Sequence, residues 1–132
     1  MTDKERLPTY RLTIGSRIDE RDRKPLTVFT LETMREFTSF QYDLVVRELF
    51  TGDALRFAIT GLTPPDISMR RGGPARYSRE LSDLNGTYDI TVEGLDKKEE
   101  TFAVRINGRS IELLHAPPRS FVQVMISNTE QE

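Results

Sequence analysis

Apolar and polar residues alternate along much of the chain, a pattern typical of strands that bury one face. The alternation is clearest in residues 87–95, where Tyr88, Ile90 and Val92 fall on one side and threonines and acidic residues fall on the other. The same pattern, with less regularity, predicts strands in four further segments, at 10–14, 26–31, 40–50 and 121–126.

The clearest local prediction is a β-hairpin over residues 101–114. The pair Asn107-Gly108 favours a two-residue type I′ turn, because both central residues of that turn need positive φ. With this pair as the loop, Val104 faces Ile111, and the hairpin gains one apolar face. That face consists of Phe102, Val104, Ile106, Ile111 and Leu113.

A second hairpin is predicted around Gly52-Asp53, with Phe50 opposite Leu55. Glu48 lies on the otherwise apolar face of the first strand of this hairpin. A β-bulge, or an edge position in the sheet, would explain a carboxylate at this place.

Two segments also carry helix signals. Residues 33–36 have the form of a capping box, so helix and strand compete over residues 33–40. Ser78 is a suitable N-cap for one helical turn over residues 78–84, which would end at Asn85-Gly86. The sequence leaves both alternatives open at these two places.

The number and spacing of the strands predict an all-β fold. About seven or eight short strands, separated by Gly, Pro and Asn, are typical of an antiparallel sandwich or barrel. One apolar and one polar face on each strand suits two sheets packed face to face. We therefore expect residues 1–132 to form a single antiparallel β-sandwich, Ig-like or jelly-roll-like, with one or two short helical turns.

Residues 63–85 lack the strand pattern and predict a long loop inserted in this domain. Guanidinium groups bind phosphate or carboxylate through paired hydrogen bonds, and glycines let backbone amides approach an anion. The segment therefore predicts an anion- or partner-binding site made of Arg70, Arg71, Gly72, Gly73, Arg76, Tyr77 and Arg79. The alternative is a solvated loop whose arginines pair with local acids such as Asp66, Glu80 or Asp83, or stack on Tyr77.

Composition excludes several kinds of chemistry. The chain has no Cys and one His, His115, so disulfides, thiolate nucleophiles and the usual zinc ligand sets are excluded, and no cofactor or metal is expected. A net charge of -2 argues against nonspecific nucleic-acid binding. The polar N-terminus and the lack of a long apolar run predict a cytoplasmic protein without a membrane span.

The predicted function is a non-enzymatic binding or protein-interaction module. Its Arg/Gly/Pro-rich loop would contact an acidic protein surface or an anionic small ligand, and a homodimer through an edge strand is a further arrangement. The alternative is a small-molecule or carbohydrate-binding domain, although the absence of Trp disfavours sugar stacking. A carboxylate-dependent enzyme is the least favoured hypothesis, because no pair of acidic residues stands out.

Overall fold

Nine strands make up the computed structural model, which describes residues 9–37, 43–63, 73–118 and 120–127. The strands in chain order are β1 (Tyr10–Ile18), β2 (Pro25–Phe37), β3 (Asp43–Thr51), β4 (Ala54–Thr63), β5 (Gly73–Ser82), β6 (Asn85–Glu93), β7 (Glu99–Asn107), β8 (Ser110–His115) and β9 (Val122–Ser127). The predicted all-β class is confirmed.

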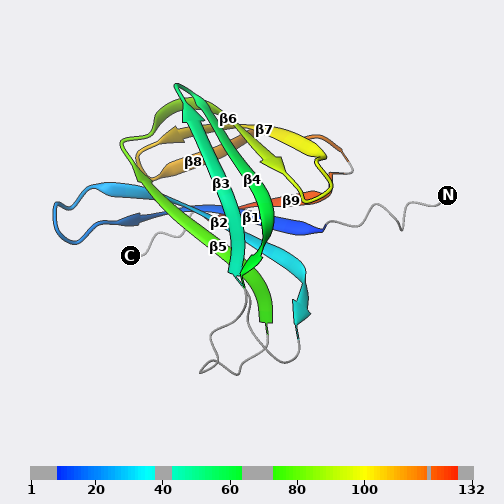
Figure 1. The fold of residues 1–132 in the computed structure, drawn as a ribbon. Helices are drawn as coiled ribbons and strands as arrows, with labels where there is room; N and C mark the ends of the chain where they lie inside the picture. Colours follow the sequence, from blue (N-terminus) through cyan, green and yellow to red (C-terminus); the bar gives the residue numbers. More distant parts are fainter. Residues whose placement is uncertain (1–8, 38–42, 64–72, 119, 128–132) are drawn as a thin grey trace.

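The nine strands belong to one sheet in the order β8-β7-β6-β4-β3-β5-β2-β1-β9, and this sheet curls into a nearly closed barrel (Figure 1). The two end strands, β8 and β9, approach each other without a hydrogen-bonded ladder. Just beyond the β1–β9 ladder, the Ser16 hydroxyl of β1 donates to the backbone oxygen of Arg109, in the turn between β7 and β8, at 3.4 Å. The structure therefore differs from the predicted sandwich of two separate sheets, and it has more strands than expected.

Not all neighbouring strands are antiparallel. β1 pairs in parallel with β9, β4 pairs in parallel with β6, and β3 pairs in parallel with β5 at one position. Alternation along a strand shows which side chains share a face, but it carries no information about the neighbour or its direction. The antiparallel expectation therefore holds for the hairpins and for β2 with β5, and it is wrong for these three pairs.

Side chains fill the interior of the barrel. Inward-facing residues of the described strands form one apolar cluster, and its largest members without solvent exposure are Phe29, Phe57 and Phe102. The predicted apolar sides of the strands face this cluster: Tyr88, Ile90 and Val92 of β6 are all buried. Burial of apolar surface of this kind is the main favourable term in folding.

The two predicted hairpins have different outcomes. In the β3–β4 hairpin, Phe50 lies opposite Leu55, as the sequence predicts. In the β7–β8 hairpin, Val104 lies opposite Leu113, so the register is shifted by two residues from the prediction. A shift of two keeps every side chain on the same face, and the predicted apolar face is therefore still correct.

The shift arises because the β7–β8 turn is centred on Gly108 and Arg109 rather than on Asn107-Gly108. Gly108 has φ of 58°, and Asn107 is not among the residues with positive φ. The backbone N–H of Gly108 donates to the side-chain oxygen of Asn85 at 3.2 Å. Asn85 is distant from the turn in sequence. Turn preferences consider only neighbouring residues, so they could not predict this contact.

Neither segment with a helix signal is helical where the structure describes it: residues 33–37 and 78–82 are strand, and residues 83 and 84 connect β5 to β6. β2 continues as a strand to Phe37, through the capping-box residues. β5 covers residues 73–82, which the sequence assigns to the long loop, and it pairs with β2 so that Leu31 lies opposite Tyr77. The strand pattern of β5 is hidden because Arg79 occupies an inward position between Tyr77 and Leu81.

An arginine on the outside of the barrel connects β4 to its neighbour β6 and to β7, the next strand beyond it. Arg56 lies 2.6 Å from the carboxylate of Glu93 and also contacts the carboxylate of Glu99. The hydrogen bond from Arg56 lowers the pKa of Glu99. A carboxylate whose pKa is lower in the folded chain stabilises the fold above its unfolded pKa, and this stabilisation is lost as the pH falls through the folded pKa.

We therefore expect the Glu99→Gln variant to be less stable than the wild type at neutral pH, and we expect this difference to disappear as the pH falls through the lowered pKa of Glu99 in the folded chain. Urea unfolding at a series of pH values measures this difference. The matched control is Glu20→Gln, which changes an exposed glutamate with no ion pair among the described residues. A stability difference for Glu99→Gln that does not depend on pH would contradict the prediction.

Candidate functional site

β3 and β5 are joined at one end only. Within the described residues they pair at a single position, Asp43 opposite Arg76, and beyond it the two strands separate (Figure 1). We call the stretch between residues 44–51 of β3 and residues 77–82 of β5 the β3–β5 seam. Side chains that pack against the core are only partly buried along the seam: Val46, Phe50, Tyr77 and Leu81.

A polar cluster crosses the β3–β5 seam. The Tyr77 hydroxyl donates a hydrogen bond to the Glu48 carboxylate, and the Arg79 Nε lies 3.6 Å from the same carboxylate oxygen. The Glu48 side chain is 24% exposed, so its charge is partly removed from water and needs these two partners. Of the two explanations that the sequence offers for Glu48, the edge position is therefore the correct one. The β-bulge of β3 lies at Val45 and Val46 instead.

Aromatic rings lie beneath this cluster. The buried Phe57 ring contacts Phe50 at 5.3 Å and Tyr77 at 6.1 Å between centroids, and it contacts Phe29 at 5.5 Å. The Arg79 guanidinium lies 5.9 Å from the centroid of the Phe50 ring. These contacts are within the range of aromatic pairs and cation–π interactions.

The sequence-predicted site residues do not form one surface in the part of the chain that the structure describes. Arg70, Arg71 and Gly72 lie outside the described residues, and Gly73 is the first residue of β5. Arg76 points to the outside of the barrel, where its Nε lies 3.2 Å from Glu32. Tyr77 and Arg79 instead belong to the seam cluster. Arg76 and Arg79 both pair with carboxylates, but their partners are not the acids expected from the sequence. The partners come from neighbouring strands instead.

The outer face of β3 carries a strip that the sequence prediction missed. Val45 and Leu49 are 42% and 59% exposed, and Arg47 lies between them in the same alternating set. Among the described residues, no carboxylate forms an ion pair with Arg47. The signal in the sequence is that apolar residues occupy both faces of this strand, and we call these three residues the β3 strip.

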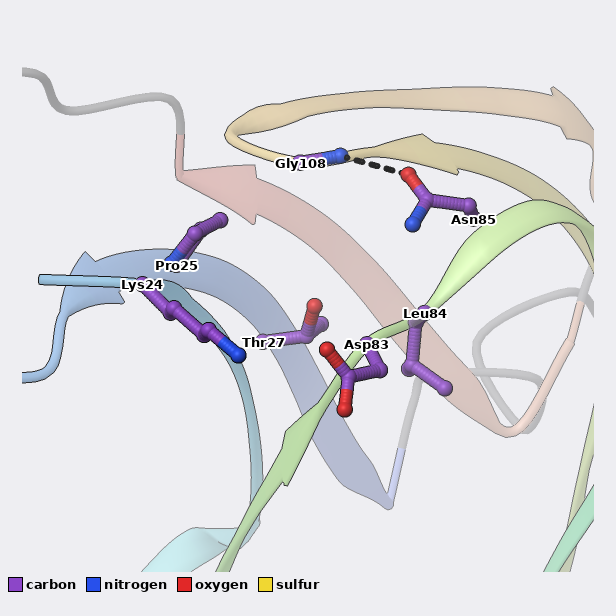
Figure 2. Close-up of a pocket in the computed structure, with 7 residues that line it drawn as sticks. All are labelled: Lys24, Pro25, Thr27, Asp83, Leu84, Asn85 and Gly108. Carbon is purple, nitrogen blue, oxygen red and sulfur yellow. Dashed lines mark hydrogen bonds between the residues drawn. The ribbon is translucent and has the colours of Figure 1, made fainter. Parts of the chain in front are cut away.

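A pocket of about 130 Å³ opens at the end of the barrel where three connections meet (Figure 2). The connections are the β1–β2 loop, the β5–β6 corner and the β7–β8 turn. The lining residues are Lys24, Pro25, Thr27, Asp83, Leu84, Asn85 and Gly108. The sequence prediction names Asp83 only as an arginine partner and does not identify this pocket.

Other candidate chemistry finds no support in the described residues. His115 is exposed at the end of β8. No group of three or more His, Asp or Glu side chains in the described ranges could hold a metal ion. None of the described residues belongs to a helix of the length and apolarity that crossing a membrane requires.

Comparisons with protein-family models, with curated proteins and with solved structures find no match to this chain. The functional hypotheses below therefore depend on geometry and chemistry alone.

Proposed function

We propose that this chain is a non-enzymatic protein-interaction module that binds an acidic segment of a partner protein along β3. The observation that carries the proposal is the β3 strip, an exposed cation between two exposed apolar side chains on a strand with an open edge. The proposed contact surface is β3 rather than the loop predicted from the sequence, because Arg76 and Arg79 are already paired with carboxylates.

The open edge of β3 supports binding of an extended segment. From Leu44 to Thr51, the edge of β3 that faces β5 has no ladder partner among the described residues. Unpaired strand edges are a recurrent site at which an extended peptide adds to a sheet through main-chain hydrogen bonds. Alternate side chains of such a peptide would then lie beside the β3 strip, because strand side chains repeat every two residues.

The charges favour an acidic partner over a basic one. Arg47 is exposed and has no carboxylate partner in the described part of the chain. A carboxylate between two apolar residues of the peptide would face Arg47, while the apolar residues would cover Val45 and Leu49. Charge complementarity of this kind selects partners and speeds association.

The alternative functions have less support. A ligand inside the barrel would have to displace Phe29, Phe57 and Phe102, which have no solvent exposure. The carboxylate of Glu48 is already held by Tyr77 and Arg79, which disfavours its use in catalysis. A homodimer through the open edge of β3 competes directly with the proposed partner, and the experiment below distinguishes the two.

Selection from a displayed library of extended peptides tests the proposal. We expect the selected peptides to alternate apolar and acidic residues and to bind less tightly as salt screens the charges. The Arg47→Glu variant reverses one charge, and it should bind these peptides at least about tenfold more weakly than the wild type. The matched control is Lys98→Glu, which makes the same reversal on the exposed connection between β6 and β7.

Two results would contradict the proposal. The first is a selected pool without acidic enrichment, or one that binds Arg47→Glu as tightly as the wild type. The second is a wild-type dimer in sedimentation that dissociates in the Leu49→Ser variant, because the β3 strip would then bind a second copy of the chain.

A further inference from the structure

The pocket at the end of the barrel contains a buried hydroxyl group that has no partner among the residues that the structure describes. Thr27 lies on the inner face of β2 and is 3% exposed, and it is the buried polar residue of the described core. Its hydroxyl makes no hydrogen bond within the described residues, although nearly all buried polar groups in proteins have one. A hydroxyl that is buried beside a pocket and lacks a partner indicates that the pocket has a polar occupant.

Two opposite charges lie at the same pocket. Figure 2 shows the side chains of Lys24 and Asp83 directed toward each other, with Thr27 between them. In the described part of the chain neither the Lys24 ammonium nor the Asp83 carboxylate has an ion-pair partner, so the two groups face the pocket without neutralising each other at close range. Asp83 has φ of 62°, which aspartate tolerates better than most residues.

An amide group completes the lining. The side-chain oxygen of Asn85 accepts a hydrogen bond from the Gly108 N–H at 3.2 Å, which fixes the orientation of the amide (Figure 2). Its NH₂ group has no acceptor among the described residues, so it remains a donor for an occupant. The pocket therefore offers two donors and one cation for a carboxylate, and one carboxylate for an ammonium group.

The volume limits the size of the occupant. Drug-sized ligands need pockets of about 300 Å³ or more. A cavity of about 150 Å³ holds benzene, so the 130 Å³ here suits a molecule of about five or six non-hydrogen atoms. Glycine and alanine are zwitterions of that size.

The geometry points to a binding site for a small zwitterion of the α-amino acid class. Its carboxylate would accept hydrogen bonds from Lys24, the Thr27 hydroxyl and the Asn85 amide, and its ammonium group would pair with Asp83. The side chain of the amino acid would have to be small, because Pro25 and Leu84 also line the space. This site is separate from the β3 strip, so either proposal can fail without the other.

Titration of the folded chain with L-alanine, followed by backbone amide NMR, tests the site. We expect saturable shifts at residues 24, 26, 27, 83–85 and 108, with a Kd of about 0.1–10 mM for so small a ligand. Propionate and ethylamine each keep only one of the two charges, and both should bind at least about tenfold more weakly than alanine.

Three variants identify the groups that bind. Alanine binding should be about tenfold weaker in each of Lys24→Gln, Asp83→Asn and Thr27→Val. Thr27→Val should keep or raise Tm, because it replaces an unpartnered buried hydroxyl with a methyl group of similar size. Lys98→Gln removes the same charge as Lys24→Gln at a distant exposed position, and it should leave alanine binding unchanged.

Several outcomes would overturn the proposal. Shifts that do not saturate by about 100 mM alanine would show that there is no site. Propionate binding as tight as alanine would show a simple anion contact with Lys24. A large fall in Tm for Thr27→Val would show that the hydroxyl has a structural partner.

Discussion

Replacing Phe57 with alanine is expected to lower the free energy of unfolding by about 3–5 kcal/mol. Phe57 has no solvent exposure, and its ring contacts Phe29, Phe50 and Tyr77. Truncation would therefore remove buried surface and leave a cavity that its neighbours can fill only in part. The loss of stability should be near the upper end of this range, because the Phe57 ring contacts both strands of the β3–β5 seam.

Urea denaturation measures the effect, with Leu49→Ala as the matched control on the adjacent strand. Leu49 is 59% exposed, so its truncation should change the free energy of unfolding by less than about 0.5 kcal/mol. Equal losses for the two variants would show that Phe57 is not a central core residue.

Replacing Gly86 with alanine is expected to cost about 1–3 kcal/mol of stability. Gly86 has φ of 131°, which side-chain-bearing residues rarely adopt, and a Cβ atom there would meet nothing within 4 Å. The cost would therefore come from backbone strain rather than from a clash. The residue is needed where the chain leaves β5 and turns into β6, next to Asp83, whose φ is also positive.

Gly61→Ala is the control for this second prediction. Gly61 lies inside β4, has no positive φ, and would also meet nothing within 4 Å. Alanine there should be neutral or slightly stabilising, because glycine loses more conformational entropy than alanine when a strand forms. If thermal unfolding gave the same loss for both variants, strain at Gly86 would not be the cause.

Sequence predicts this fold best where packing and local pattern agree. Tyr88, Ile90 and Val92 alternate with polar residues because one face of β6 is buried, and the core contains all three. β5 escaped prediction for the opposite reason. Its inward positions include Tyr77 and Arg79, which the open seam allows to reach water and to pair with Glu48.

The candidate sites are less predictable than the strands, because they combine residues that are distant in sequence. Asp83 and Asn85 lie near Lys24 and Gly108 only because the β5–β6 corner meets two other connections at one end of the barrel. The β3 strip is different, since Val45, Arg47 and Leu49 are close in sequence. The exposure of the β3 strip depends on which face of β3 lies outside the barrel. The sequence does not indicate which face this is, because both faces carry apolar residues.

The parallel pairing of β1 with β9 has a consequence for how the chain folds during synthesis. Tyr10 lies opposite Val122, so this ladder joins residues from the two ends of the described chain. Contacts between residues so far apart form slowly, because a long loop must close first. On the ribosome, β1 therefore remains an uncovered edge until β9 has emerged, and the barrel is complete only after residues 122–127 have been made.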